Sequence, residues 1–250
     1  MLLQGKVAIV TGGVTGIGKS IAIGLHEQGA KIAINHLPSQ INLFNDIKEI
    51  IPDALSVPGD ISKPETSQFI VDETIKKFQK IDILVSNAGI CEFKDFLETD
   101  AQTYQRTVEI NLNGSYFITQ AVGKQMKEQG HGGSIIAISS ISALVGGGKQ
   151  VHYTPTKAGI LSLMQSCACA LGPYGIRCNA ILPGTIRTQL NDEDMKDDTK
   201  RQYMEGRIPL GRLGKTDDLI GPAVFLASDL SEYVNGAQLL VDGGLFVNLQ

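Results

Sequence analysis

Two side chains late in the sequence, Tyr153 and Lys157, are suited to transferring a proton. They are four residues apart in a stretch that favours a helix, so both are expected on one face of that helix. A free phenol titrates near pH ~10, and an ammonium ~5 Å away at an effective dielectric constant of ~20 would lower its pKa by roughly two units. The spacing therefore predicts a tyrosine that acts as an acid or base near neutral pH.

A glycine-rich turn near the amino terminus is typical of a phosphate-binding site. Gly12, Gly16 and Gly18 follow the apolar run 7–10, and apolar residues then recur with helical period over 17–25. Glycines let the backbone turn tightly and approach a pyrophosphate, while the amino end of a helix offers free N–H groups and a partial positive charge. The order of strand, turn and helix therefore predicts a dinucleotide site.

Two later positions fit the same ligand. Asp60 follows the third apolar run and could accept a hydrogen bond from an adenine amino group. Asn87, Ala88 and Gly89 end the fourth run, where the adenosine ribose should pass. Either position taken alone could also be explained by a turn, because turns favour Asp, Asn and Gly.

The choice between NAD and NADP depends on the end of the second apolar run. An acidic residue there normally binds the ribose hydroxyls of NAD, and a basic residue accepts the 2′-phosphate of NADP. Asn35 and His36 occupy these positions, and neither is an acid. Thr15 and Leu37 stand where an arginine would typically hold the phosphate. We therefore expect both cofactors to be used, with modest discrimination.

Seven short runs rich in valine and isoleucine alternate with helix-like stretches. Each run is continuously apolar, which is typical of strands in a parallel sheet that helices cover on both faces. The runs are 7–10, 31–35, 54–57, 81–86, 134–139, 177–182 and 238–241. The sequence thus predicts an α/β fold: one Rossmann-type, doubly wound domain over residues 1–250 with a seven-stranded parallel sheet.

The least regular segment is 185–215, which contains an acidic stretch and then Pro-Leu-Gly-Arg-Leu-Gly. Its charge and lack of periodicity indicate a mobile flap, although an ordinary solvated loop would have the same composition. The segment directly follows the sixth predicted strand, and ligands of such sheets bind beyond the carboxyl ends of the strands. We therefore expect a substrate flap at about 185–215.

Composition and charge narrow the possible ligands. The 250 residues are 42% hydrophobic and 19% charged, with a formal net charge of -4 and a pI near 5.6. This balance argues against nucleic acid as a partner, and no basic run marks a membrane surface. No apolar stretch is long enough for a membrane span, and residues 1–10 lack the charged start, apolar middle and cleavage site of a signal peptide. We expect a cytoplasmic enzyme with a small-molecule substrate.

The cysteines and histidines do not have the spacing of a metal site. The four cysteines lack a C-x-x-C pair, and the four histidines form no i, i+4 pair. We therefore expect no catalytic metal, and we interpret the cysteines as buried, reduced small hydrophobes. The cysteines are Cys91, Cys167, Cys169 and Cys178.

These motifs together resemble the short-chain dehydrogenase/reductase family over the whole chain. The resemblance is carried by the T-G-x-x-x-G-x-G turn at 11–18, Asn87-Ala88-Gly89, Asn111, Ser140, the Y-x-x-x-K of Tyr153 and Lys157, and Pro183-Gly184. It implies a catalytic tetrad of Asn111, Ser140, Tyr153 and Lys157. Ser140 is preferred to Ser139 because the family's serine lies thirteen residues before the tyrosine.

The resemblance also implies a role for each residue. Ser140 would hold the substrate oxygen, and Tyr153 would exchange the proton. Lys157 would lower the tyrosine pKa and bind the nicotinamide ribose, and Asn111 would interrupt its helix and hold a water. The expected cofactor-binding residues are Gly12, Thr15, Gly16, Ile17, Gly18, Asn35, His36, Asp60, Ile61, Asn87, Ala88, Gly89, Tyr153, Lys157, Pro183, Gly184, Ile186 and Thr188.

Three segments resemble more narrowly those family members of fungi and bacteria that oxidise L-rhamnose to its lactone. They are 139–147, 152–157 and the tail 241–250. The implied reaction is oxidation of the anomeric carbon of L-rhamnose, or of a related aldose, which needs polar groups around the sugar. The expected substrate residues are Ser140, Ser142, Gln150, Tyr153, Thr185 and Asn191, although solvated loop positions would look alike.

Two other functions stay open at this point. One is a broad carbonyl reductase that uses NADPH to reduce ketones or ketoacyl groups. The other is a dinucleotide sensor without catalysis, against which the intact tetrad argues. Family members are commonly homotetramers that pack central helices and last strands across two-fold axes, and the apolar tail 245–249 suits such burial.

Overall fold

A seven-stranded parallel sheet forms the centre of the protein, for which we have a computed structural model that describes residues 1–189 and 197–248. The strand order is β3-β2-β1-β4-β5-β6-β7, and every neighbouring pair is parallel. The strands are β1 (Val7–Thr11), β2 (Lys31–His36), β3 (Leu55–Pro58), β4 (Ile83–Ser86), β5 (Gly133–Ile138), β6 (Ile176–Pro183) and β7 (Gln238–Val241). The predicted fold class and all seven strands are confirmed.

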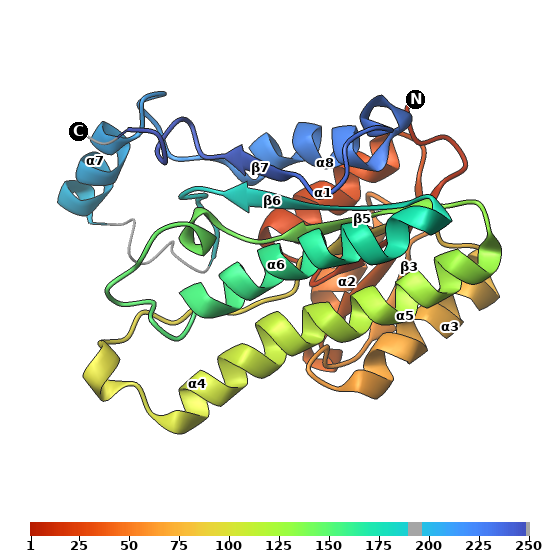
Figure 1. Cartoon of the computed structure of the whole chain (residues 1–250), viewed down its shortest axis with the longest axis horizontal. Coiled ribbons are helices and arrows are strands. Elements are labelled where there is room, and N and C mark those ends of the chain that lie inside the picture. The colour runs from red at the N-terminus through yellow and green to blue at the C-terminus, as the bar shows by residue number, and fades with distance from the viewer. Residues whose placement is uncertain (190–196, 249–250) are drawn as a thin grey trace.

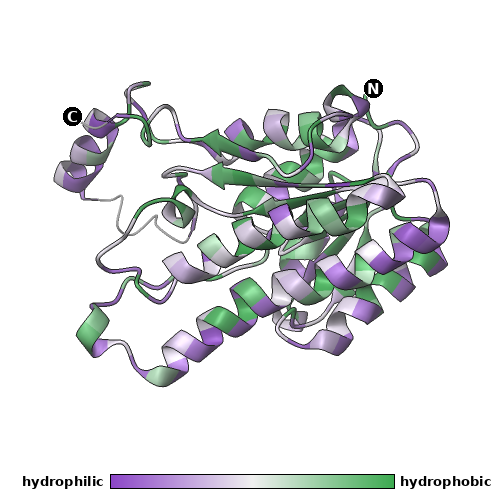
Figure 2. Ribbon diagram, in the orientation of Figure 1, coloured by the Kyte–Doolittle hydropathy of each residue, from purple (hydrophilic) through white to green (hydrophobic). Residues whose placement is uncertain are grey.

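Helices cover both faces of the sheet, as the continuous apolar strands require. The helices are α1 (Gly16–Glu27), α2 (Ile41–Lys48), α3 (Pro64–Phe78), α4 (Ala101–Thr107), α5 (Gly114–Gln129), α6 (Thr154–Leu171), α7 (Asp198–Arg207) and α8 (Ile220–Ala227). One buried cluster packs α1, α2 and α8 on the sheet, and a second packs α3, α5 and α6 on it. The two layers are visible in Figure 1, and Figure 2 shows the apolar strands between them.

Strand ends differ slightly from the sequence-based prediction. The predicted run 81–86 becomes a strand only at Ile83, because the Gln129 side chain bonds both backbone groups of Ile81, at 2.9 and 2.8 Å. Asp82 accepts a hydrogen bond from the Val7 N–H at 2.8 Å. A side chain thus takes the place of sheet bonds at Ile81, whereas the backbone of Asp82 already bonds Val7 and Ser134 on the neighbouring strands.

The segment 185–215 has more regular structure than predicted. It contains α7, whose amino end is capped by Asp197, which accepts hydrogen bonds from the Thr199 and Lys200 N–H groups. An isolated bridge also pairs Ile186 with Gly214. The helix is polar along its length (Figure 2), so it lacks the apolar stripe by which amphipathic helices are found in sequence.

The carboxyl ends of the strands meet on one side of the molecule. The order in which strands are added to the sheet changes direction between β1 and β4: β1 leads outward to β2 and β3, and β4 leads outward to β5, β6 and β7 on the other side. Ligands of doubly wound sheets bind at such a switch point. In Figure 1, α7 lies on the side toward which β6 and β7 point.

Candidate active site

A cavity of 1040 Å³ lies beyond the carboxyl ends of the strands and brings together nearly all the predicted site residues. Its walls include the glycine turn, the ends of β2 to β6, the start of α6 and the face of α7. Gly18 and Asn111 do not line this cavity and lie behind its wall. Asn191 lies outside the described residues. The single cavity therefore joins the predicted dinucleotide site to the predicted proton-transfer site.

The glycine turn has a backbone that side chains would not permit. Gly12 and Gly16 have φ values of +60° and +53°, in the left-handed region that favours glycine. A Cβ on Gly18 would approach the Gly12 carbonyl oxygen to 2.5 Å. The first turn of α1 has no acidic side chain. The turn can therefore present backbone N–H groups to an anion at the start of α1.

Asn87 fixes this turn against the end of β4. Its side-chain Nδ2 donates to the Thr11 and Gly12 carbonyl oxygens at 3.0 and 3.2 Å. The hydroxyl of Thr11 accepts hydrogen bonds from the backbone N–H groups of Asn87 and Ala88. The Asn-Ala-Gly sequence thus locks two strand ends together at the switch point.

The polar atoms of Asn35 and His36 bond within the protein. Asn35 Nδ2 donates to the carbonyl oxygens of Val57 and Gly59. His36 Nε2 lies 2.8 Å from Ser56 Oγ, and its Nδ1 lies 2.8 Å from the carbonyl oxygen of the next residue. Both residues border the cavity, but their side chains anchor the end of β2 to β3.

Tyr153 and Lys157 lie at the amino end of α6, as the spacing predicted. Tyr153 is the residue just before the helix, and Lys157 lies in the first turn of the helix. Lys157 Nζ lies 5.5 Å from the centroid of the Tyr153 ring and donates to the Ile138 carbonyl oxygen at 2.9 Å. The two side chains share the cavity wall below the end of β5.

The two neighbouring serines have different partners. Ser139 is buried and donates its hydroxyl to the Lys157 carbonyl oxygen at 2.8 Å. Ser140 borders the cavity and forms a side-chain hydrogen bond with Tyr153. Its Oγ also accepts from the Ser142 N–H at 3.0 Å. Of the two hydroxyls, that of Ser140 is therefore the one placed beside the phenol.

The pKa of Tyr153 moves in the opposite direction to the one predicted. Burial of the phenol raises its pKa, and the nearby Cys91 thiol adds to the rise, whereas the hydrogen bond with Ser140 lowers it. Burial also lowers the pKa of the Lys157 ammonium to about 8. The prediction considered only the attraction between the two charges, and withdrawal of both groups from water outweighs it.

Asn111 lies in a π-helical segment, Val108–Asn113, between α4 and α5. The side chain is fully buried and bonds both backbone groups of Ile90, at 2.8 and 2.9 Å. Its Nδ2 also lies 3.2 Å from Thr156 Oγ1 on α6. The predicted interruption of this helix is confirmed, and Asn111 connects it to the first turn of α6.

Several cavity residues were missed from the sequence. Cys91 follows the Asn-Ala-Gly segment, and its Sγ accepts a hydrogen bond from Gln150 Nε2 at 3.2 Å. The position of Cys91 after a predicted strand end was a usable signal, but the cysteine was interpreted as a buried hydrophobe. That interpretation holds for Cys178, whereas Cys169 is exposed and Cys91 and Cys167 are half-buried; all four are free thiols.

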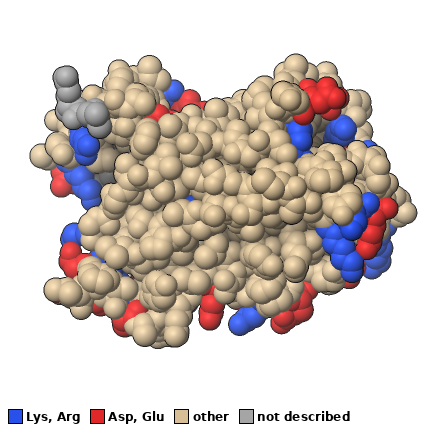
Figure 3. Space-filling model, in the orientation of Figure 1, with Lys and Arg blue, Asp and Glu red and all other residues tan. Residues whose placement is uncertain are grey.

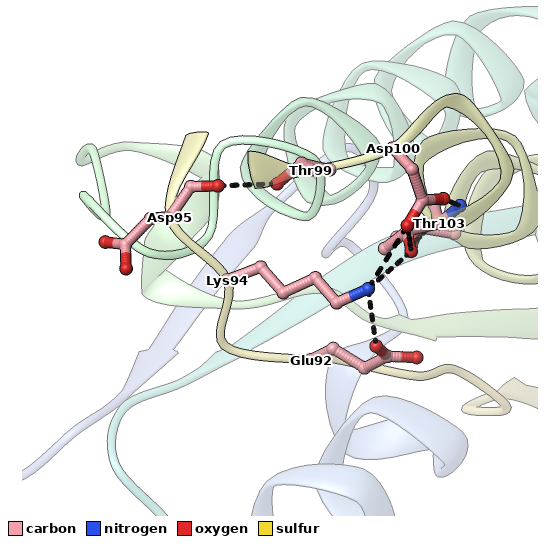
Figure 4. Close-up of polar contacts among 7 residues, drawn as sticks. Glu92, Lys94, Asp95, Thr99, Asp100 and Thr103 are labelled. Carbon is pink, nitrogen blue, oxygen red and sulfur yellow. Dashed lines mark hydrogen bonds and ion pairs between the residues drawn. The ribbon is translucent and has the colours of Figure 1, made fainter. Parts of the chain in front are cut away.

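The loop that carries Cys91 is held by a cluster of ionic contacts (Figure 4). Lys94 Nζ lies 3.6 Å from Glu92 Oε2, 3.5 Å from Asp100 Oδ2 and 2.8 Å from Thr103 Oγ1. The Lys94 N–H also donates to the Lys149 carbonyl oxygen at 3.0 Å. The loop after β4 is thus tied both to α4 and to the segment before α6.

Further cavity residues come from α7 and the tail. Lys200, Met204 and Arg207 lie on one face of α7 and border the cavity. Leu245, Phe246 and Asn248 of the tail border it as well. Within residues 1–189 and 197–248, the structure has no group of three or more metal-ligating side chains and no helix long and apolar enough to cross a membrane.

Comparison with known proteins agrees with this geometry. A family model described as enoyl-(acyl carrier protein) reductase matches residues 12–246. The chain belongs to the short-chain dehydrogenase/reductase family. It is 65% identical to an L-rhamnose-1-dehydrogenase of Scheffersomyces stipitis, covering 100% of this chain and 99% of the relative.

Two further proteins are similar over almost their whole length. An L-rhamnose 1-dehydrogenase (NAD(P)(+)) of Sphingomonas sp. (strain SKA58) is 55% identical, covering 100% of this chain and 99% of the relative. The crystal structure of a gluconate 5-dehydrogenase from Burkholderia cenocepacia J2315, in complex with NADP and tartrate, has a TM-score of 0.92 and 33% identity. That comparison covers 98% of this chain and 96% of the other.

Proposed function

We propose that this protein oxidises L-rhamnose, or a closely related aldose, at the anomeric carbon to the lactone, with NAD or NADP as hydride acceptor. The observation that carries the oxidoreductase activity is the single cavity that holds both the glycine turn and the Tyr153–Lys157 pair. The choice of sugar rests on the 65% and 55% identical relatives, whose names give L-rhamnose as substrate.

The cavity fits a dinucleotide at its glycine turn. The missing Cβ atoms of Gly12 and Gly16, the free amino end of α1 and the absence of an acid in its first turn all suit a pyrophosphate. Asp60 accepts the Ser62 N–H with Oδ1, which orients its carboxylate at the end of β3. Pro183, Gly184, Ile186 and Thr188 would hold the nicotinamide ring from the segment after β6.

Use of both cofactors is part of this proposal. The side chains of Asn35 and His36 bond inward, and neither residue is an acid. A carboxylate that repels a 2′-phosphate is missing there, and so is an arginine that binds one. The Sphingomonas relative is named for both cofactors.

The protein's own groups would handle the proton. When bound, the nicotinamide ring accepts the hydride from the anomeric C–H bond. Tyr153 would take the hydroxyl proton of that carbon while Ser140 donates a hydrogen bond to the same oxygen, and the C=O bond of the lactone forms. Lys157 would stabilise the phenolate as a nearby cation. Asn111 would keep the segment at Ile90 and the first turn of α6 in register through its three hydrogen bonds.

Polar groups for the sugar come from the segments on either side of the cavity. Ser142 and Gln150 lie on the β5–α6 segment, and Thr185 follows β6. The Gln150 side chain donates a hydrogen bond to Cys91 Sγ at 3.2 Å, and its Oε1 lies so close to Gly147 that a side chain at Gly147 would clash with it. A carboxamide held in this way can bond sugar hydroxyls with little loss of side-chain entropy.

Initial rates of nicotinamide reduction test the proposal. The purified protein is assayed with L-rhamnose, L-mannose, L-lyxose and a simple secondary alcohol, each with NAD and with NADP. We expect saturable oxidation of L-rhamnose that Tyr153→Phe lowers by roughly 10²- to 10⁴-fold, because the variant cannot accept the proton. The rate should rise above pH 7 as phenolate begins to form, because burial raises the Tyr153 pKa, and the rise should end as Lys157, whose pKa burial lowers to about 8, loses its charge.

The alternatives give other results in the same assay. Activity confined to the alcohol, or to ketone reduction with NADPH, would assign the protein as a carbonyl reductase. Binding of a dinucleotide without turnover of any substrate would favour a sensor. Ser139→Ala is the matched control for Ser140→Ala, because the Ser139 hydroxyl bonds the Lys157 backbone instead of facing the cavity.

We further propose a cytoplasmic homotetramer in which 1–250 act as one domain and part of 185–215 moves as a flap. The exposed face of α6 consists of Pro155, Ser162, Gln165, Ser166, Cys169 and Ala170, none of which is charged. Figure 3 shows a broad uncharged surface over α5 and α6, with charges gathered at its edges. Such a surface suits burial against a second copy of the chain, and the four free thiols suit a reducing compartment.

Light scattering tests the assembly. Ser162→Arg places a charge in the proposed interface and should lower the mass from tetramer to dimer or monomer. Lys127→Arg, at the charged end of α5, is the control and should leave the mass unchanged. A tetramer that persists in Ser162→Arg would contradict the proposed interface.

A further inference from the structure

Residues 183–188, called the clasp below, border the cavity where the nicotinamide ring is proposed to bind, and they are paired with a later stretch of the chain. That stretch, residues 212–218, is called the support. The N–H of Gly214 donates to the Thr185 carbonyl oxygen at 3.0 Å, and the Gly214 carbonyl oxygen accepts the Arg187 N–H at 2.9 Å. A side chain at position 214 would clash with the clasp. The close pairing therefore depends on a glycine in the support.

The clasp has a cavity on each side. Thr185 and Ile186 border both the main cavity and a second cavity of 220 Å³. The support residues that line the second cavity are Arg212, Gly214 and Asp218. The start of the clasp is fixed by β7, because the Gly184 N–H donates to the Val241 carbonyl oxygen at 3.0 Å. Beyond that point the segment has open space behind it, so its position depends on the hydrogen bonds to the support.

One carboxylate holds the support in shape. Arg212 Nη1 and Nη2 donate to Oδ2 and Oδ1 of Asp218 at 2.7 and 2.9 Å, which is a two-pronged ion pair. The Lys215 N–H also donates to Asp218 Oδ2, at 2.7 Å, and Arg212 Nη1 donates to the Leu213 carbonyl oxygen at 3.0 Å. The bonds from Arg212 and Lys215 lower the pKa of Asp218 to about 2, so the carboxylate is charged at neutral pH. These bonds close around Gly214, the residue that pairs with the clasp.

The support is also fastened to α1, the helix that begins at the glycine turn. Ser20 Oγ lies 2.8 Å from Thr216 Oγ1 and 3.0 Å from Asp217 Oδ1. The next helix, α8, lies beside α1 (Figure 1), and its Ile220 is so close to Gly24 that a side chain at Gly24 would clash with it. The support therefore connects the helix at the proposed pyrophosphate site to the clasp at the proposed nicotinamide site.

We propose that Arg212 and Asp218 are positioning residues for the nicotinamide half of the cofactor. Their ion pair fixes the support, the support fixes the clasp through Gly214, and the clasp orients the ring for hydride transfer. Neither charged side chain borders the main cavity, so the pair acts through the clasp and not on the ligand itself. Ser20 sets the distance between the clasp and the glycine turn. The inference rests on the proposed function and names the part of the cofactor that this pair controls.

Two ligands separate the clasp from the rest of the cofactor site. ADP-ribose has the adenosine and pyrophosphate of NADH but no nicotinamide ring, so it does not use the clasp. The measurement is the dissociation constant of each ligand, by isothermal titration calorimetry, for the wild type, Arg212→Met, Asp218→Asn and Ser20→Ala. For Arg212→Met we expect NADH to bind about tenfold more weakly, because a loosened clasp must be ordered on binding. ADP-ribose should change less than about twofold.

The rates should follow the same order. In Arg212→Met, kcat for L-rhamnose should fall roughly 10- to 10²-fold, because a small misplacement of the ring slows hydride transfer. Arg212→Lys keeps the charge without the two-pronged geometry, so its NADH affinity and kcat should lie between those of Arg212→Met and the wild type. The side chains of Arg212 and Asp218 are 48% and 33% exposed, and such pairs add little to stability, so these variants should fold.

Lys76→Met is the matched control, because it removes one partner of the surface ion pair between Lys76 and Glu73 on α3. It should change neither dissociation constant. Equal weakening of NADH and ADP-ribose in Arg212→Met would overturn the inference, since it would indicate a general loss of the site, and unchanged binding of both would overturn it too.

The experiment also distinguishes this inference from the proposed function. A wild type that binds NADH but does not oxidise L-rhamnose would overturn the sugar assignment alone, and the ratio of the two dissociation constants would still decide the role of Arg212. A wild type that does not bind NADH would overturn both. If Arg212→Met does not fold, Asp218→Asn and Ser20→Ala still give the ratio, and an unchanged ratio in both counts against the role of the support.

Discussion

Each end of the parallel sheet holds a cation, Lys157 buried at the carboxyl end and Arg177 half-buried at the amino end. Arg177 donates to three carbonyl oxygens at the end of α8 and beyond it, those of Leu226, Ser228 and Val234, at 2.8 to 3.4 Å. Burial lowers the pKa of Arg177, and the nearby Asp229 and Glu232 offset part of this lowering. The arginine thus completes a network that joins β6 to α8.

Lys157 is buried with much less compensation. Its ammonium donates to the Ile138 carbonyl oxygen, and burial lowers its pKa to about 8. The same group borders the cavity beside Tyr153. We infer that a charged side chain withdrawn from water stabilises the fold when many protein groups bind it. A charged side chain that has few such partners and borders a cavity is instead a candidate for chemistry.

The largest expected effect comes from removing the charge at the carboxyl end. Lys157→Met should lower kcat/KM by roughly 10³-fold, or about 4 kcal/mol, because the phenolate loses its cation. The same variant should unfold at a higher denaturant concentration than the wild type, because methionine fills a similar volume without burying an ammonium. Steady-state rates and urea titrations measure the two effects. Lower stability in Lys157→Met would contradict the comparison.

Replacing the cation at the amino end with methionine should lower stability and leave activity unchanged. Arg177→Met should reduce the free energy of unfolding by about 4 kcal/mol, since three carbonyl oxygens lose a charged donor. Activity per folded molecule should stay near the wild-type value, because Arg177 does not border the cavity. Thermal unfolding followed by circular dichroism, with rates measured well below the transition, checks both statements.

The pH dependence of stability should identify Lys157. The folded lysine releases its proton near pH 8 and the unfolded one near 10.5, so the unfolded state binds more protons between these values and stability rises with pH. From pH 8 to pH 10 the gain should be about 2 kcal/mol, because the two states differ by less than one proton over much of this range and a full proton is worth ~1.36 kcal/mol per pH unit. The quantity to measure is the difference between wild type and Lys157→Met, in which other titrating groups cancel. A flat difference would show that the ammonium is not penalised by burial.

The smallest expected effect concerns Ser134, which shares a hydrogen-bond acceptor with Arg177 at the amino end of the sheet. Ser134 donates its hydroxyl to the Leu226 carbonyl oxygen at 2.8 Å, the same oxygen that Arg177 binds. Ser134→Ala should cost about 1 kcal/mol in the wild type and more in Arg177→Met, where only the Ser231 hydroxyl, at 3.1 Å, would still donate to that oxygen. A double-mutant cycle in urea gives the coupling, and strictly additive effects would argue against a shared network.

Much of the fold followed from local pattern. The continuous runs at 7–10 and 238–241 predicted buried parallel strands, because a strand covered on both faces has no polar side. The helical spacing of Tyr153 and Lys157 predicted their common face. The polar helix α7 was missed, since periodicity indicates only helices that bury an apolar stripe.

The sequence by itself determined the order of strands and helices, the glycine turn at Gly12 and Gly16, and the placing of Tyr153 and Lys157 on one helical turn. Only the tertiary structure decided the raised pKa of Tyr153, the contact of Cys91 with Gln150 and the return of Phe246 to the cavity. The physical reason is that spacing along a helix or strand is fixed by local geometry. Loss of hydration and contact between distant segments depend on how the whole chain packs.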